Sequence, residues 1–309
     1  MCIYSPQDEY RLTYCMHRTL LSEPRLYYDD LGKRCDASRN TVTKYWKQGL
    51  KKKVFFPPQI RLKMFENRKE YIYLVQTDEA NKLYEHFKDR DELVYMSYTS
   101  GKFDIFLQTN RLLDVLPDGT LFHGSRSNYI YPDTPFRSYE SALNLMENKL
   151  TREQRKSEIT VEYPPEPIGI GNPHYVWMIF PQLKYNLRVS YTRVVKTLHI
   201  SFESFQKGLE HLFTVSTKLL PYYPLGFRLY SQYFFIFWSN YEQFLCEFFG
   251  LLPCHVSITK VNDALIMYVS IQKGEDMSER LFKMCSTMVD LGLINRFWSS
   301  KPIHGWIRD

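Results

Sequence analysis

The stretch Ser-Arg-Asn-Thr-Val-Thr-Lys-Tyr-Trp-Lys-Gln-Gly-Leu-Lys-Lys-Lys, residues 38–53, has the pattern of a short amphipathic helix. Ser38 is a good N-cap, because its hydroxyl can accept a hydrogen bond from a backbone N–H of the first turn. Val42 and Trp46 stand four residues apart and predict one buried face. The residues predicted to face outward are Arg39, Asn40, Thr43, Lys44 and Lys47.

The predicted outer face of this helix carries only positive charge. Residues 38–53 contain six Lys or Arg and no acidic residue, and residues 1–56 hold eleven basic against six acidic residues, which is +5 of the chain's +6. A solvated helix face usually mixes both signs, so this excess indicates a polyanion. Arg, Asn and Thr suit base edges in the major groove, and lysines suit phosphates. The predicted DNA contacts are Ser38, Arg39, Asn40, Thr43, Lys44, Lys47, Lys51 and Lys52.

Two shorter helices precede this one. Residues 10–21 have helical spacing, and residues 26–34 form a second short helix. Residues 35–37 then make a tight turn into Ser38. Three short helices with such a turn predict a helix-turn-helix domain over residues 1–56.

Beyond this domain a proline pair stops the helix, and the hydrophobic period changes to two. Residues 57–163 predict the order β-α-β-β-α-β of a ferredoxin-like domain, with Ala142, Leu145 and Met146 turned inward on its second helix. After a connector strand at 59–64, the predicted elements are strands at 71–76, 94–99, 103–109 and 159–163 and helices at 78–88 and 138–149.

The same order of elements then begins again. Residues 164–172 are rich in proline and glycine and predict a stiff linker. Residues 173–217 predict a second helix-turn-helix with Ser201 in the place of Ser38, degenerate because its recognition helix is net negative. Residues 218–309 predict a second ferredoxin-like domain. The expected fold class is α+β: a winged helix-turn-helix plus a ferredoxin-like βαββαβ domain, repeated twice.

Composition excludes several classes of protein. The six cysteines form no C-x-x-C pair and follow no signal peptide, so they are expected to be reduced thiols of a cytoplasmic protein. Nothing stands at metal-ligand spacing, and neither a metal nor a cofactor is expected. The longest apolar runs fall far short of the ~20 residues that span a bilayer, so no membrane contact is expected.

The turn at Gly101 to Asp104, placed after a helix-turn-helix and one βα unit, resembles the G-x-x-D turn of the archaeal Lrp/AsnC family of transcription regulators. The resemblance implies a cytoplasmic homodimer that binds double-stranded DNA, with Gly101 and Asp104 at the site of a small-molecule effector such as an amino acid. In the second half Val261 and Ala264 occupy these positions, so no such site is expected there.

The main expectation is therefore a sequence-specific DNA-binding transcription regulator without catalytic residues or enzymatic activity. One alternative is an enzyme, because siroheme decarboxylases resemble two Lrp-like halves that keep the helix-turn-helix as scaffold. Another is an interaction scaffold that binds no DNA. The histidines available to an enzyme share no motif; they are His123, His174, His199, His255 and His304.

Overall fold

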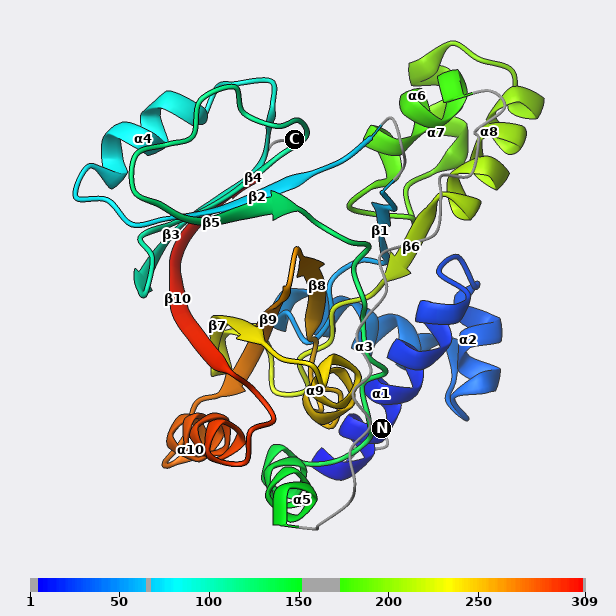
Figure 1. Ribbon diagram of the computed structural model, residues 1–309. Coiled ribbons are helices and arrows are strands. Elements are labelled where there is room, and N and C mark those ends of the chain that lie inside the picture. The colour runs from blue at the N-terminus through cyan, green and yellow to red at the C-terminus, as the bar shows by residue number, and fades with distance from the viewer. Residues whose placement is uncertain (1–4, 65–67, 152–172, 308–309) are drawn as a thin grey trace. The chain divides into compact units, whose positions relative to one another are not determined.

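The computed structural model describes residues 5–64, 68–151 and 173–307 (Figure 1). The chain groups into two compact units, each made from two separate stretches of sequence. Unit 1 comprises Met1–Lys63 and Ile168–Leu229, and unit 2 comprises Met64–Pro167 and Tyr230–Asp309. The protein is a mixed α+β fold whose strands pair antiparallel. The strand predicted at 159–163 lies outside the described residues.

Unit 1 begins with three helices that follow the predicted order. These are α1 (Pro6–Ser22), α2 (Tyr28–Arg34) and α3 (Arg39–Lys52). The Ser38 hydroxyl accepts a hydrogen bond from the Thr41 N–H at 3.2 Å, which caps α3 as expected. Lys53 adopts a left-handed conformation with φ of 55° and ends the helix.

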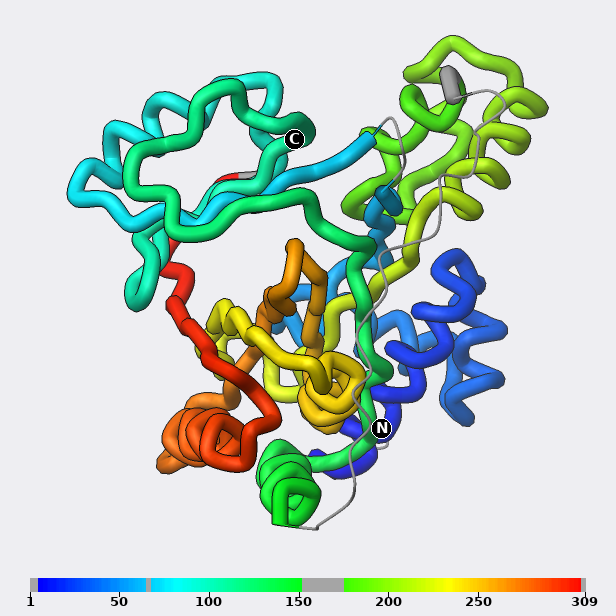
Figure 2. The backbone as a smooth tube through the Cα atoms, in the orientation of Figure 1, coloured from blue at the N-terminus to red at the C-terminus, as the bar shows by residue number. Residues whose placement is uncertain are grey.

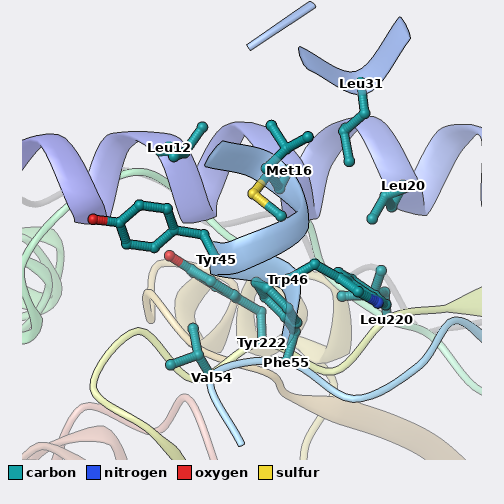
Figure 3. Close-up of a cluster of buried hydrophobic side chains, with 11 residues drawn as sticks. Leu12, Met16, Leu20, Leu31, Tyr45, Trp46, Val54, Phe55, Leu220 and Tyr222 are labelled. Carbon is teal, nitrogen blue, oxygen red and sulfur yellow. The ribbon is translucent and has the colours of Figure 1, made fainter. Parts of the chain in front are cut away.

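The core of these helices lies on the face that the hydrophobic period predicted. Figure 3 shows Met16 and Leu20 of α1 and Trp46 of α3 directed toward one another. Phe55 stacks on Trp46 with ring centroids 4.8 Å apart, and Tyr222, far along the chain, belongs to the same cluster. Burying such side chains contributes about 1.5–3 kcal/mol each, which fastens the short helices together.

A second set of three helices completes unit 1. These are α6 (Pro173–Leu183), α7 (Tyr191–Leu198) and α8 (Phe202–Thr214), with Ser201 capping α8 through a 3.0 Å bond from the Ser204 N–H. Strand β1 (Gln59–Leu62) follows the first set and β6 (Ser216–Leu219) the second, and the two pair antiparallel. A short 3-10 turn, η1 (Phe227–Leu229), ends the unit.

Each set of helices has one arginine that binds backbone carbonyls of the other set, and we call these two residues the exchanged arginines. Arg25 donates to the Leu187 and Val189 carbonyls at 2.6 and 2.7 Å. Arg188 donates in return to the Pro24 and Leu26 carbonyls at 2.8 and 3.2 Å. The exchange is symmetrical, because each arginine also lies over the first tyrosine of the opposite second helix.

The expectation of reduced cysteines is wrong for one pair. Cys15 of α1 and Cys35 at the end of α2 form a disulfide with Cα atoms 5.7 Å apart. The sequence offered no sign of this pair, since the two residues meet only when α2 folds back on α1. Cys246, Cys254 and Cys285 are free and buried.

Unit 2 contains one eight-stranded sheet with the order β5-β2-β4-β3-β10-β7-β9-β8. The strands from the first half of the chain are β2 (Tyr71–Val75), β3 (Leu93–Gly101), β4 (Ile105–Thr109) and β5 (Thr120–Ser125). Those from the second half are β7 (Tyr230–Trp238), β8 (Ser257–Val261), β9 (Ala264–Gln272) and β10 (Arg296–Ile307). The helices are α4 (Ala80–Phe87), α5 (Tyr139–Thr151), α9 (Glu242–Phe249) and α10 (Met277–Asp290).

The long strand β10 joins the two halves of this sheet. It pairs with β7 at its start and with β3 at its end, and Figure 2 traces it in red between them. The sheet curls so that Phe106 of β4 stacks on Phe234 of β7 with ring centroids 4.4 Å apart. The inner face of the curl is therefore a shared aromatic core of both halves.

Two details of unit 2 differ from the prediction. No strand was predicted between residues 109 and 138, yet β5 pairs with β2 at the sheet edge because Leu121 and Phe122 pack on the inner core. On α5 the buried positions include Ala142 and Met146 as predicted, but Leu145 is 44% exposed. No helix among the described residues is long and apolar enough to cross a membrane.

Candidate functional site

The residues predicted to contact DNA lie together on and around α3. Arg39, Asn40 and Lys44 line an open hollow of about 830 Å³ with Ser38, and Lys47, Lys51 and Lys52 continue along the exposed face of the helix. Thr43 is half-buried beside them.

The structure also places acidic groups at this surface. Asp29 and Asp36 line the same hollow, and Asp29 forms a 3.5 Å ion pair with Arg39. Glu9 of α1 likewise lies 3.5 Å from Lys52. Residues 38–53 contain only basic charges, but the folded surface around α3 is mixed, because α1 and α2 place acidic side chains beside it. Contact of these side chains with DNA stays a prediction.

Gly101 and Asp104 both have structural contacts. Gly101 has a φ of 142°, and a Cβ there would stand 2.5 Å from the Ser299 carbonyl oxygen of β10. The Asp104 carboxylate accepts a 2.9 Å hydrogen bond from the Thr77 N–H, which holds the connection from β2 to α4. Binding of a small molecule at this turn stays a prediction.

A buried ion pair that the sequence did not reveal lies at the edge of the sheet in unit 2. Arg126, just after β5, donates from Nε to Glu70 Oε2 at 2.9 Å, and both side chains are about 95% buried. Arg68 donates to the other carboxylate oxygen at 2.8 Å. Burial pushes the pKa of Glu70 upward, but the charges of Arg126 and Arg68 outweigh it and hold that pKa below its ordinary value.

The segment that carries Arg126 closes the curled sheet against β8. Arg126 forms an antiparallel β-bridge with Val261, and Ile130 forms one with Ile258. The two bridges are four residues apart in the segment after β5 but only three residues apart in β8. One extra residue of this kind makes a β-bulge, which redirects side chains and is common near functional sites. We call residues 126–131 with β8 the seam.

The bulge directs Tyr129 into a chain of hydrogen bonds. Gln108 donates from Nε2 to Glu70 at 2.6 Å, and the Tyr129 hydroxyl donates to Gln108 Oε1 at 3.1 Å. An ionised carboxylate only accepts hydrogen bonds, so Glu70 sets the orientation of the Gln108 amide and thereby the direction of the tyrosine hydroxyl.

Beyond Tyr129 the seam carries a row of stacked planar groups. The Arg126 guanidinium lies 4.1 Å over the Tyr129 ring, Tyr129 and Tyr131 are 5.9 Å apart at 26°, and Tyr131 and His255 are 5.6 Å apart at 27°. All three rings are half-buried. We call Arg126, Tyr129, Tyr131 and His255 the stacked row.

Only part of this site could be read from the sequence. His255 was one of the candidate histidines, and the structure places it in the row. His123 lies on β5 against Tyr73, His304 is exposed on β10, and His199 ends α7 in unit 1, so these three do not join it. The side chain of His174 lies outside the described residues. Glu70 and Arg126 went unnoticed because charged residues outside a motif predict solvent-exposed positions.

Comparison with known proteins gives structural matches alone. No family model matches the chain, and no curated protein does. A crystal structure of the siroheme decarboxylase NirDL matches with a TM-score of 0.45 and 11% identity, covering 97% of this chain and 93% of that one. A second, with an iron-uroporphyrin III analogue, matches with a TM-score of 0.41 and 11% identity, covering 90% and 85%. These similarities assign no residue a role.

These findings correct the main expectation. The matched structures are those of an enzyme, and membership of the Lrp/AsnC regulators finds no support in any family model. The comparisons therefore do not support the predictions of a DNA-binding transcription regulator and of a chain without enzymatic activity, and these predictions are not kept. The predicted homodimer finds no support either, because antiparallel pairing joins the two halves of one chain within each unit.

Proposed function

We propose that this chain is an enzyme of the siroheme-decarboxylase kind, which removes CO2 from a carboxylate arm of a tetrapyrrole. Each half would be an Lrp-like module, a winged helix-turn-helix followed by a ferredoxin-like domain. The observation that carries the proposal is the stacked row at the seam, where flat rings, a histidine and a neutralised buried ion pair come together.

The helix-turn-helix modules fit the role of scaffold in such an enzyme. In unit 1 they are held to each other by the β1–β6 pair and by the exchanged arginines. On α8 the exposed Lys207 pairs with Glu203 at 2.8 Å, so little free positive charge faces outward there. Helices whose surface is not uniformly basic can serve as a scaffold without binding DNA, as the proposed enzyme requires.

The stacked row suits a flat macrocycle. Stacking of an aromatic ring on a planar partner contributes a free energy of about 0.5–1.5 kcal/mol in addition to that of burying apolar area. The rings of Tyr131 and His255 lie next to each other and are tilted by only 27°. The Glu70 carboxylate next to the row is paired with both Arg126 and Arg68, so its negative charge is fully compensated. A carboxylated ligand would therefore meet no uncompensated negative charge from Glu70.

The reaction needs a proton donor beside the reacting arm. When an arm R–CH2–COO⁻ loses CO2, the bond between its two carbons breaks and the electron pair stays on the CH2 carbon. A proton then completes the methyl group of R–CH3. We assign this donation to His255, because a protonated imidazole can donate a proton and the residue stands at the end of the stacked row. Tyr129, fixed through Gln108 and Glu70, keeps the row in place.

Titration of the protein with iron-uroporphyrin III, followed by the absorbance of the macrocycle, tests binding. Incubation with siroheme, followed by mass spectrometry for loss of CO2, tests turnover. His255→Ala should lower the rate by about 10²–10⁴ fold, the usual worth of a positioned acid. His304→Ala is the matched control, since His304 is exposed on β10, and it should keep the wild-type rate.

Two results would contradict the proposal. Wild-type protein that neither binds the macrocycle nor releases CO2 would exclude the function. An unchanged rate in His255→Ala would remove the histidine from the reaction even if siroheme is consumed.

A further inference from the structure

The two sets of three helices in unit 1 share one register from the loop before the second helix to the cap of the third. The exchanged arginines, the tyrosines that begin the second helices and the serines that cap the third helices all recur at one constant offset along the chain. The corresponding pairs are Arg25 and Arg188, Tyr28 and Tyr191, and Ser38 and Ser201.

The same offset shows where the two sets differ. Cys15 corresponds to Met178, within α6, and Cys35 corresponds to Leu198, at the end of α7. The first set therefore holds a disulfide where the second holds two half-buried apolar side chains. The disulfide is thus an addition to one copy of a repeated module, and the other copy shows what the fold uses without it.

The disulfide holds the C-terminal end of α2, whereas the exchanged Arg188 holds its beginning at Tyr28. Helix α2 has only 7 residues, and among its side chains Leu31 is the one large apolar group in the buried cluster. Helices this short are not stable alone, so α2 depends on tertiary contacts. Cys35 is also the last residue before the turn at Asp36, whose φ of 48° leads the chain to the Ser38 cap of α3.

We infer that the Cys15–Cys35 disulfide is a redox-responsive staple of the first three-helix module: its reduction loosens α2 and the turn into α3 and leaves the second module unchanged. In the reaction a small dithiol attacks one sulfur, the Cys15–Cys35 bond breaks, and a mixed disulfide forms. The second thiol of the reductant then releases the other cysteine. Two electrons and two protons pass to the protein, which gains two thiols, while the reductant becomes a cyclic disulfide.

The other described cysteines do not share this chemistry. Burial raises the pKa of Cys246 to about 12, and it raises the pKa values of Cys254 and Cys285 further. Their thiols therefore stay protonated and unreactive in the folded protein. Cys15 and Cys35 are only half-buried, so a small thiol can approach them.

Hydrogen exchange of the full chain, with and without dithiothreitol, tests the inference. Reduction should speed exchange in α2 by roughly thirtyfold to several hundredfold, as expected for losing a cross-link over a loop of about 20 residues. Exchange in α7 should not change. Alkylation in the native state followed by peptide mapping should mark Cys15 and Cys35 after reduction only.

The chain supplies its own control in the variant Cys15→Met/Cys35→Leu, which copies the residues of the second module. Its α2 exchange should be the same with and without dithiothreitol. The inference is overturned if both cysteines are alkylated without reductant. It is equally overturned if complete reduction leaves α2 exchange unchanged, or if α2 and α7 respond alike.

Discussion

Glu70 shows how one buried carboxylate can organise a site through its neighbours. An unpaired buried charge costs several kcal/mol, and here two arginines and an amide compensate the carboxylate completely. Because the group must stay ionised for these bonds to form, its protonation in acid would weaken the seam as well as the ion pair. The stability of unit 2 and the geometry of Tyr129 are thereby linked.

The first prediction concerns acid stability. The folded pKa of Glu70 lies below the ordinary value of 4.5, so its contribution is present above that value and is lost as the pH falls through the folded pKa. Across that window Glu70→Gln should reduce the slope of unfolding free energy against pH by up to about 1.4 kcal/mol per pH unit. Urea unfolding at a series of acid pH values measures the slope. Equal slopes for both proteins would mean that Glu70 is not held ionised.

The second prediction concerns Gly101. An alanine there must keep a φ of 142° and place its Cβ against the backbone of β10, so Gly101→Ala should cost about 2–3 kcal/mol. Gly292 has a φ of 66° with nothing within 4 Å, and Gly292→Ala should cost only about 1 kcal/mol. Thermal unfolding of both variants separates the clash from the backbone strain. Equal losses would show that β10 does not pack against the turn.

At the scale of elements, the exchanged arginines explain how two short helical sets form one unit. The three helices of each set bury a small core, and a core of that size gives marginal stability. Each arginine satisfies two carbonyls at the entry to the opposite second helix and lies on its first tyrosine. The modules thereby stabilise each other where their own helices begin.

The third prediction follows from this exchange. Arg25→Ala and Arg188→Ala should each destabilise unit 1 by about 1.5–3 kcal/mol, the usual worth of hydrogen bonds from a charged group. The exposed Arg193 on α7 is the matched control, and Arg193→Ala should change stability by less than about 0.5 kcal/mol. Chemical denaturation followed by circular dichroism reports the differences. If Arg25→Ala and Arg188→Ala lowered the free energy of unfolding no more than Arg193→Ala, the exchanged arginines would not stabilise unit 1.

At the scale of the whole molecule, the first and second halves of the chain pair with each other within each unit. In unit 1 the pairing is β1 with β6, and in unit 2 it is β3 with β10 along one side and the seam along the other. Separate halves would have to find these edges in a second chain. A fused chain satisfies them internally.

The fourth prediction is that the full chain is a monomer. Strand β10 of the same chain already pairs with the edge of β3. A second chain could therefore form few additional strand hydrogen bonds there. Analytical ultracentrifugation over a wide concentration range should give the mass of one chain. A stable dimer would mean that a surface other than these strand edges joins two copies.

The fifth prediction separates scaffold from catalyst. Lys44→Glu/Lys47→Glu alters the exposed face of α3, which lies in unit 1, whereas the stacked row lies in unit 2. The variant should release CO2 from siroheme at the wild-type rate. If the variant instead lost both CO2 release and binding of DNA in a gel shift, α3 would take part directly in the function of the protein.

The sequence by itself determined the local elements, because their signals lie within a few residues of one another. Ser38 and Ser201 each begin a helix through a bond from a backbone N–H of the first turn, and the short apolar runs of β2 and β7 predict buried strands. The tertiary structure alone decided which halves pair, that β5 takes the sheet edge, that Cys15 meets Cys35, and that the row from Arg126 ends at His255. These contacts join residues far apart in the chain, and long-range packing, which no local pattern encodes, brings them together.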